Sequence, residues 1–369
     1  MDNLTYDQML EKVKQNGEAL RFASEELKDN YDIVLTAVKN NYKALQYASE
    51  NLRNNYNIVL AAIESDYLGS ALLYASDELK NNREIILSSF RFYGYGMYYA
   101  SKELQDDREL VLTAVKKYGL TLEFASKKLR KDREVVLTAV KTKGDALRYA
   151  LKKLRNDREI VLAAVGQKSY SDALKYASDE LKNDREVVLV AVKQCGEALE
   201  YASEDLKDDY DIVLEAVRQN GYALKYASYK LKRNRNIVLE TINQNGHALR
   251  YVSNALTDDQ NIVREAVFNN VNGFYFASYK LKEDRDFVLS IVSKVGEALY
   301  FTSDKMRDNQ RVVLTAVSNY GYALRYASKR LQDNLKVVLT AVGNDSKALK
   351  YASKRLQKDP EILKLLETV

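Results

Sequence analysis

The stretch DREVVLTAVKTKGDALRYALKKLRND, from Asp132 to Asp157, decides the fold. Asp132 is a favourable N-cap residue, and Glu134 suits the positive end of a helix dipole that starts there. The apolar residues that follow continue at helical spacing to Val140, so we expect a first helix here. Gly144 comes shortly after it, where glycine commonly ends a helix.

The rest of this stretch predicts a second helix. Its apolar residues cover one broad face at about 100° per residue. They are Ala146, Leu147, Tyr149, Ala150 and Leu154. Tyr149 lies at the edge of that face, so we expect its ring to pack between neighbouring repeats while its hydroxyl stays in water.

The same pattern recurs along the chain, marked by an aromatic residue that Ala and Ser usually follow. The marker residues are Phe22, Tyr47, Tyr74, Tyr99, Phe124, Tyr149, Tyr176, Tyr201, Tyr226, Tyr251, Phe276, Phe301, Tyr326 and Tyr351. They are 25 residues apart, except for two steps of 27. No repeat can bury its apolar face alone. The sequence therefore predicts an all-α fold, an α-solenoid (superhelix) of about fourteen 25-residue helix–turn–helix units.

No linker or change of composition interrupts the repeats, so we expect one continuous α-solenoid over residues 1–369. Residues 1–29 are expected to form an N-terminal capping unit, because Gln8 and Lys12 replace the apolar residues of interior repeats. Residues 359–369 are expected to form a C-terminal capping helix, with Pro360 at the tolerated first helical position.

The repeat resembles a family known as domain of unknown function 4116. The resemblance is most specific from Asp107 through Ala150 and from Asp184 through Ser203, and two 25-residue repeats make one family repeat of about fifty residues. Departures cluster between Val252 and Gln310, where Arg264 replaces a leucine, Thr302 replaces an alanine and Gly273 is displaced from the usual glycine position. The resemblance implies a helical repeat protein and no particular activity.

Composition excludes several classes of protein. The chain has one Cys, one His and one Pro, so it can form neither an internal disulfide nor an ordinary zinc site. No stretch approaches the roughly 20 apolar residues of a membrane-spanning helix, and the first residues lack a signal-peptide pattern. We therefore expect no metal, no cofactor, no membrane partner, and an intracellular, cytoplasmic location.

The residues suited to catalysis have ordinary structural explanations. His247 follows the turn glycine, a position that varies freely among repeats, and Cys195 lies in a loop two repeats away. The glutamates are repeated features of helix starts, where they complement the helix dipole: Glu84, Glu109, Glu134, Glu159 and Glu186. No phosphate-binding glycine motif is present. We expect no enzymatic activity and see no small-molecule substrate.

Charge is distributed in bands along the chain, although the net charge is only +5. Residues 116–158 carry a net +9 and residues 324–358 a net +7, whereas residues 177–216 carry a net −8. We name the candidate contact residues of the first band the basic band. They are Lys127, Lys128, Arg130, Lys131, Arg148, Lys152, Lys153 and Arg155. Dipole complementation and solubility are the alternative explanation for this band.

Aromatic residues outside the marker position form a second candidate surface. They are Phe92, Tyr95, Tyr98, Tyr275, Tyr279 and Tyr300. Tyr98, Tyr275 and Tyr300 stand just before a marker, where other repeats usually have a charged or polar residue that should face outward. Exposed aromatic residues favour a contact surface, and looser local packing is the competing explanation.

These patterns favour a non-enzymatic helical-repeat scaffold that recognises a protein partner through its curved face and charge bands. The first alternative is sequence-independent nucleic-acid binding through the basic bands at 116–158 and 324–358. An acidic band that interrupts the basic ones favours protein over nucleic acid. A second alternative is a self-assembling structural protein whose oppositely charged bands pair between copies.

Overall fold

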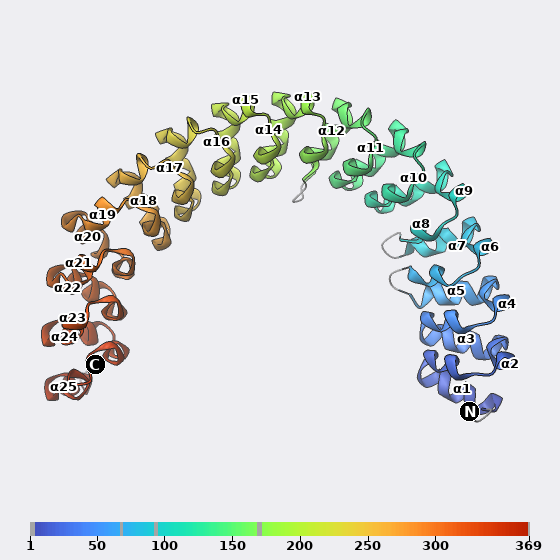
Figure 1. Ribbon diagram of the computed structural model, residues 1–369, viewed down its shortest axis with the longest axis horizontal. Coiled ribbons are helices and arrows are strands. Elements are labelled where there is room, and N and C mark those ends of the chain that lie inside the picture. The colour runs from blue at the N-terminus through green and yellow to red at the C-terminus, as the bar shows by residue number, and fades with distance from the viewer. Residues whose placement is uncertain (1–3, 67–68, 92–94, 168–171, 368–369) are drawn as a thin grey trace. The chain divides into compact units, whose positions relative to one another are not determined.

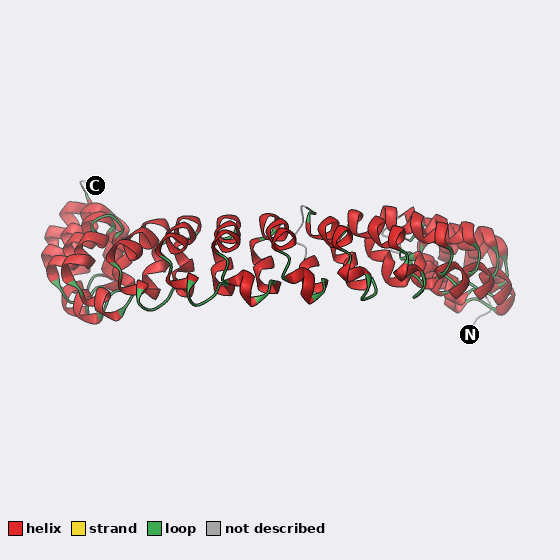
Figure 2. Cartoon of the chain, turned by 90° about the horizontal axis from the view of Figure 1, so that it is seen from above, coloured by secondary structure: helices red, strands yellow, loops and turns green. Residues whose placement is uncertain are grey.

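The computed structural model describes residues 4–66, 69–91, 95–167 and 172–367. The repeat is a layer of three helical segments, which we call the first, second and third helix. Fourteen such layers follow one another and a last α-helix comes after them, and no strand occurs in the described ranges (Figures 1 and 2). This confirms the all-α solenoid of repeated helical units.

The first helices are α1 (Tyr6–Gln15), α3 (Tyr31–Asn40), α5 (Tyr56–Glu64), α7 (Arg83–Ser88), α10 (Arg108–Lys117), α11 (Arg133–Thr142), α12 (Arg158–Val165), α14 (Arg185–Gln194), α16 (Tyr210–Gln219), α17 (Arg235–Gln244), α18 (Gln260–Asn269), α20 (Arg285–Val292), α22 (Gln310–Asn319) and α24 (Leu335–Asn344). The 3₁₀ turn η4 (Ser89–Arg91) extends α7, and the last helix is α25 (Pro360–Leu366).

The second helices are mostly 3₁₀ in type. They are η1 (Gly17–Phe22), η2 (Tyr42–Tyr47), η3 (Ser70–Leu73), α8 (Gly96–Tyr99), η5 (Gly119–Phe124), η7 (Gly144–Tyr149), η9 (Ala173–Tyr176), η10 (Gly196–Tyr201), η11 (Gly221–Tyr226), η13 (Gly246–Tyr251), η15 (Val271–Phe276), η16 (Gly296–Phe301), η17 (Gly321–Tyr326) and η18 (Ser346–Tyr351).

The third helices have three to five residues. They are α2 (Glu25–Lys28), α4 (Glu50–Arg53), α6 (Asp77–Lys80), α9 (Lys102–Gln105), η6 (Leu129–Lys131), η8 (Leu154–Asn156), α13 (Asp179–Lys182), α15 (Glu204–Lys207), η12 (Leu231–Arg233), η14 (Leu256–Asp258), α19 (Tyr279–Glu283), α21 (Asp304–Arg307), α23 (Lys329–Gln332) and η19 (Leu356–Lys358).

The chain divides into two compact units, Met1–Val187 and Val188–Val369, which we call the N-terminal and C-terminal units. Within each unit, first helices pack on first helices of the next layer, for example α10 on α11 and α16 on α17. In the N-terminal unit the third helices α2, α4, α6 and α9 lie along one edge (Figure 1). The single continuous stack over residues 1–369 stays a prediction.

Each first helix forms for the reasons that its sequence indicates. In α11 the Asp132 side chain accepts hydrogen bonds from the backbone N–H groups of Glu134 and Val135, which lack partners inside the helix. The buried residues Val135, Val136, Ala139 and Val140 form the face that contacts neighbouring layers. In α1 the equivalent positions include the exposed residues Gln8 and Lys12; the capping unit at residues 1–29 stays a prediction.

The prediction of one second helix per repeat was wrong, because the chain leaves helical geometry after the marker. Ala125 is extended, and Ser126 begins the next segment by accepting a hydrogen bond from the Leu129 N–H. The Ser126 N–H donates instead to the carbonyl of Gln105 in the preceding layer, at 2.8 Å. This contact between layers satisfies the backbone group that a continuous helix would bond internally.

The role expected for the turn glycine was also wrong. Among the described residues only Gly69 has a positive φ, so the other glycines are not left-handed helix ends. A Cβ on Gly119 would lie 2.3 Å from the carbonyl oxygen of Ala139 in the next layer. In the same way, a Cβ on Gly296 would lie 2.4 Å from the carbonyl oxygen of Ala316. Glycine is therefore needed for the close approach of adjacent layers.

Side-chain amides at the ends of first helices also join the layers. The Asn269 Oδ1 accepts a hydrogen bond from the Gly246 N–H at 2.8 Å, and its Nδ2 donates to the carbonyl of Asn243 at 3.1 Å. Both bonded groups belong to the preceding layer. Asn40, Asn319 and Asn344 make the equivalent pairs of bonds. One side-chain amide thus bonds a carbonyl at the end of the first helix and an N–H at the start of the second helix, both in the preceding layer.

Candidate functional site

The structure places His247 and Cys195 in different layers, on η13 and at the start of η10. The His247 ring meets the Phe276 ring edge-on, with centroids 4.9 Å apart. Cys195 is free and half-buried at the start of η10. No group of His, Cys, Asp or Glu side chains suited to a metal ion occurs in the part of the chain that the structure describes.

The repeated carboxylates are engaged in a ladder of arginine contacts between layers. Arg133 Nε donates to Asp157 Oδ2 of the next layer at 2.8 Å, and the same guanidinium also pairs with Glu159. The equivalent contacts are Arg83 with Asp107 and Glu109, Arg108 with Asp132 and Glu134, and Arg158 with Asp184 and Glu186. Hydrogen bonds from the arginines hold the pKa of Asp132, Asp157 and Asp184 below the usual range of a carboxyl group. These side chains stabilise the stack and are not poised for acid–base work.

The second helices present a face on which aromatic and cationic side chains meet. In half of the layers a cation stands before the marker, and in several of these it lies over the marker rings of its own layer and the next. Arg325, for example, lies 4.9 Å from the Tyr326 ring centroid and 5.8 Å from that of Tyr351. Arg148 and Arg250 lie over their rings in the same way. These contacts leave the cation at the surface.

Two neighbouring layers of the C-terminal unit carry tyrosine in place of this cation. The ring centroids of Tyr275 lie 5.1 Å from Phe276 and 6.5 Å from Phe301, and those of Tyr300 lie 4.8 Å from Phe301 and 5.0 Å from Tyr326. Tyr275 is 64% exposed and Tyr300 is 53% exposed. The outward orientation expected for this position is confirmed. We call Tyr275, Phe276, Tyr300 and Phe301 the tyrosine face.

Tyr98 occupies the same position in the N-terminal unit, where it is 60% exposed. Its ring meets Tyr99 and Phe124 edge-on, with centroids 4.9 and 5.5 Å away. Tyr95 is also exposed, and Phe92 lies outside the described residues. Tyr279 is exposed at the start of α19 and not on a second helix. The structure therefore distributes the predicted aromatic residues over different faces.

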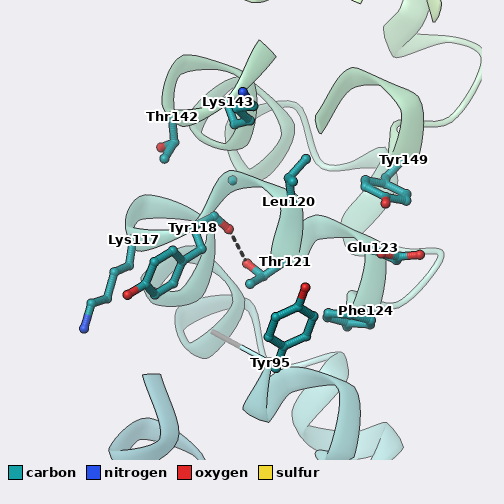
Figure 3. A pocket seen from close by; sticks show the side chains of 11 residues that line it. Tyr95, Lys117, Tyr118, Leu120, Thr121, Glu123, Phe124, Thr142, Lys143 and Tyr149 are labelled. Atoms are coloured by element: carbon teal, nitrogen blue, oxygen red, sulfur yellow. Dashed lines mark hydrogen bonds between the residues drawn. The ribbon is translucent and has the colours of Figure 1, made fainter. Parts of the chain in front are cut away.

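A pocket of about 420 Å³ lies beside Tyr95 (Figure 3). Tyr95 and Phe124 form one wall, with ring centroids 6.4 Å apart, and Tyr118, Leu120 and Tyr149 line the remainder. Figure 3 shows the Tyr95 hydroxyl directed toward Thr121. The pocket thus combines side chains from three successive layers into a largely aromatic recess.

Several polar groups of this pocket are already bonded within the protein. Thr121 Oγ1 donates to the carbonyl of Tyr118 at 2.7 Å. Burial, and then a hydrogen bond with Glu123, raises the pKa of the Tyr149 hydroxyl above its ordinary value. Lys117 Nζ lies 5.7 Å from the Tyr118 ring centroid at the edge of the recess. This arrangement offers ring surfaces to an apolar or aromatic side chain.

The basic band has two kinds of residue. Lys127, Lys128, Lys131, Arg148, Lys152 and Lys153 are exposed. Arg130 and Arg155 are half-buried, and Arg155 turns inward to donate from Nε to the carbonyl of Ala150 at 2.7 Å. Arg155 also donates to the carbonyl of Arg148. Its position therefore serves to cap the second helix, as Gln332 does in another layer.

Sequence reasoning missed the arginine ladder and the aromatic pocket. The ladder has a signal in the sequence, because Arg133 is followed by acids 24 and 26 residues later at Asp157 and Glu159. The pocket has no comparable signal, because its lining comes from residues 95 to 149 and depends on how three layers stack.

Comparison with known proteins agrees with the repeat that the structure shows. The family model described as "Domain of unknown function (DUF4116)" matches nine segments, some of which overlap, at residues 6–53, 30–80, 55–105, 107–155, 132–182, 157–207, 184–232, 234–282 and 284–332. No curated protein matches the chain. None of the described helices has the length and apolar character needed to cross a membrane.

Proposed function

The chain belongs to the family described as domain of unknown function DUF4116, and on that premise we propose that it is a non-enzymatic scaffold that binds a protein partner. The tyrosine face carries this proposal. Tyr275 and Tyr300 stand where half of the layers have a cation, and more than half of each side chain is exposed. Neither side chain is needed to bury a core.

Aromatic side chains of this kind suit a protein interface. Tyrosine is enriched at interface centres and at the residues that dominate binding energy, because it offers a large rigid ring and a polar end. On the tyrosine face the rings of Tyr275 and Tyr300 are held edge-on against Phe276 and Phe301, so little side-chain freedom is left to lose on binding. A partner that covers these rings gains apolar contact without remodelling the stack.

The test is affinity capture from the native source, with nuclease present, using the wild-type chain and the double variant Tyr275→Arg/Tyr300→Arg. Arginine restores the residue type that Arg250 and Arg325 show at this position, so the stacking on the marker rings is retained. We expect the wild-type chain to retain a stoichiometric protein that the double variant loses. The matched control is Arg325→Lys, at the equivalent position of another layer. This variant should still retain the captured protein.

Equal capture by the double variant would contradict a role for the tyrosine face. Capture that disappears when nuclease is added would instead support nucleic-acid binding through the basic bands. Light scattering at low and high salt distinguishes the remaining alternative, because self-assembly by charge pairing weakens as salt screens the charges.

A further inference from the structure

In five of the described layers a cation at the start of the third helix is neutralised by an aspartate of the layer before it. Lys230 Nζ lies 3.0 Å from Asp208 Oδ2, and the Ser228 hydroxyl donates to the other oxygen of that carboxylate at 2.5 Å. The same three-residue cluster is formed by Asp106, Ser126 and Lys128, by Asp258, Ser278 and Lys280, by Asp308, Ser328 and Arg330, and by Asp333, Ser353 and Arg355. The aspartate thus binds both the serine and the cation.

One layer of the N-terminal unit breaks this cluster at two of its three positions. Lys131 stands where the aspartate belongs, Leu151 replaces the serine, and Lys153 remains as the cation. Lys152 adds a further exposed ammonium group beside it. Together with Leu154 these residues line a recess of about 600 Å³. The recess therefore combines three ammonium groups with an apolar base. We call it the lysine recess.

No carboxylate of the described chain neutralises these lysines. The side chains of Lys131, Lys152 and Lys153 form no ion pair or hydrogen bond with any described residue. The acids nearest to these lysines in the sequence already form ion pairs with arginines. Asp132 accepts a hydrogen bond from Arg108 Nε, and Asp157 accepts one from Arg133 Nε, each at 2.8 Å. Like charges gathered in this way repel one another, and a bound anion relieves the repulsion.

We propose that the lysine recess binds a short acidic segment of a protein partner. Carboxylates of the segment would contact Lys131, Lys152 and Lys153, and an apolar side chain would lie on Leu151. This inference rests on the proposed scaffold function and adds the chemistry of the partner at a second site. Packed helices lie about 8–10 Å apart and an extended chain advances about 3.3–3.6 Å per residue, so an acidic run of about six residues crosses the two layers.

The neighbouring layers favour a short peptide over a nucleic-acid strand. Two successive layers carry Lys127 with Lys128 and Lys152 with Lys153. At the equivalent positions, the layer before these two has Lys102 and Glu103, and the layer after them has Asp179 and Glu180. A nucleic-acid backbone repeats its charge at every nucleotide and would meet these acids on both sides. A peptide of limited length places its acids on the lysines alone.

The C-terminal unit provides an internal comparison. Lys329, Arg330, Lys354 and Arg355 give it an equally cationic pair of layers. There Arg330 and Arg355 each lie 3.1 Å from their aspartates, Asp308 and Asp333. If charge alone determined binding, both surfaces would bind acids equally. The proposal predicts that the lysine recess binds more tightly.

The experiment is fluorescence anisotropy with the full chain and a labelled peptide of about six residues, glutamate throughout except for one central leucine. The test variant is Lys131→Asp/Leu151→Ser, which installs the aspartate–serine pair of the other layers. We expect it to weaken peptide binding about tenfold while its urea midpoint equals or exceeds that of the wild-type chain. A loss of binding can then not be attributed to unfolding. The matched control, Lys329→Ala/Lys354→Ala, should bind within about twofold of wild type.

Three outcomes would overturn the inference: no binding by the wild-type chain, equal binding by the Lys131→Asp/Leu151→Ser variant, or equal competition from single-stranded DNA of the same charge. The proposed function is tested by a different variant, with changes only in the tyrosine face. Tyr275→Arg/Tyr300→Arg leaves the lysine recess intact and should still bind the acidic peptide. If partner capture through the tyrosine face persists while the peptide fails to bind, only the present inference is lost.

Discussion

Gly119 lies so close to Ala139 of the next layer that a methyl group on the glycine would be 2.3 Å from the alanine carbonyl oxygen. That oxygen belongs to the backbone of α11 and accepts a hydrogen bond from the Lys143 N–H. It cannot move aside without disturbing the helix. The distance between successive layers is thus set by the absence of a side chain.

The first prediction concerns this contact. Gly119→Ala should lower the free energy of unfolding by about 1–3 kcal/mol, because the layers must separate to admit the methyl group. Urea unfolding followed by circular dichroism measures the change. Gly343→Ala in α24 is the control, because the nearest atom to its new Cβ is 3.9 Å away, and it should stabilise by about 0.5 kcal/mol. Equal effects of the two substitutions would show that layer contact is not the cause.

The second prediction concerns the marker serine. Ser228→Ala removes the hydrogen bond from the Leu231 N–H and the bond to Asp208, and should cost about 1–2 kcal/mol. The matched control is Ser253→Ala one layer later, where the buried hydroxyl has no partner because Arg233 stands where the aspartate would be. That variant should lose almost no stability. A similar loss at both positions, measured by urea midpoints, would contradict the account.

The third prediction is a pH dependence of the arginine ladder. The hydrogen bond from Arg133 lowers the pKa of Asp157, so its stabilisation is present above the unfolded-state pKa of about 3.9 and is lost as the pH falls through the folded-state value. Arg133→Gln should therefore reduce stability by up to about 1 kcal/mol at pH 7, and the difference from wild type should vanish on acidification.

The control for the ladder is Arg285→Gln, because Arg285 holds the same position in its layer but pairs with the adjacent Asp286. Its effect at neutral pH should be smaller than that of Arg133→Gln. Urea titrations at several pH values between neutral and acid provide the comparison. A stability difference for Arg133→Gln that persists at the acid end would refute the ion-pair explanation.

The fourth prediction concerns His247, whose ring packs edge-on against Phe276. Tyr222 and Tyr322 make the same kind of contact with Tyr251 and Tyr351 from the same position of their layers. His247→Tyr should therefore be neutral, whereas His247→Ala should cost about 0.5–1.5 kcal/mol. Partner capture should be unchanged in both variants. Loss of a binding or catalytic property in His247→Tyr would instead give the imidazole a chemical role.

The sequence alone was sufficient for the repeat and for its buried positions. The 25-residue spacing, the Asp132 N-cap and the apolar residues of α11 follow from helix periodicity and capping, which act within a few residues of the chain. The outward orientation of Tyr275 and Tyr300 followed from the same periodicity. The bands of charge could also be predicted from the sequence, because they depend only on which charged residues occur in each range.

Only the tertiary structure decided how each repeat meets the next. It showed that the second helix breaks at Ala125, because Ser126 bonds to the preceding layer, and that Gly119 is required by a neighbouring carbonyl. It also showed that the Arg155 side chain turns inward and that the Lys131 side chain has no acidic partner among the described residues. The contacts of Ser126 and Gly119 join residues 20 or more positions apart. Local propensity carries no information on such distances, which are set by the packing of one layer on another.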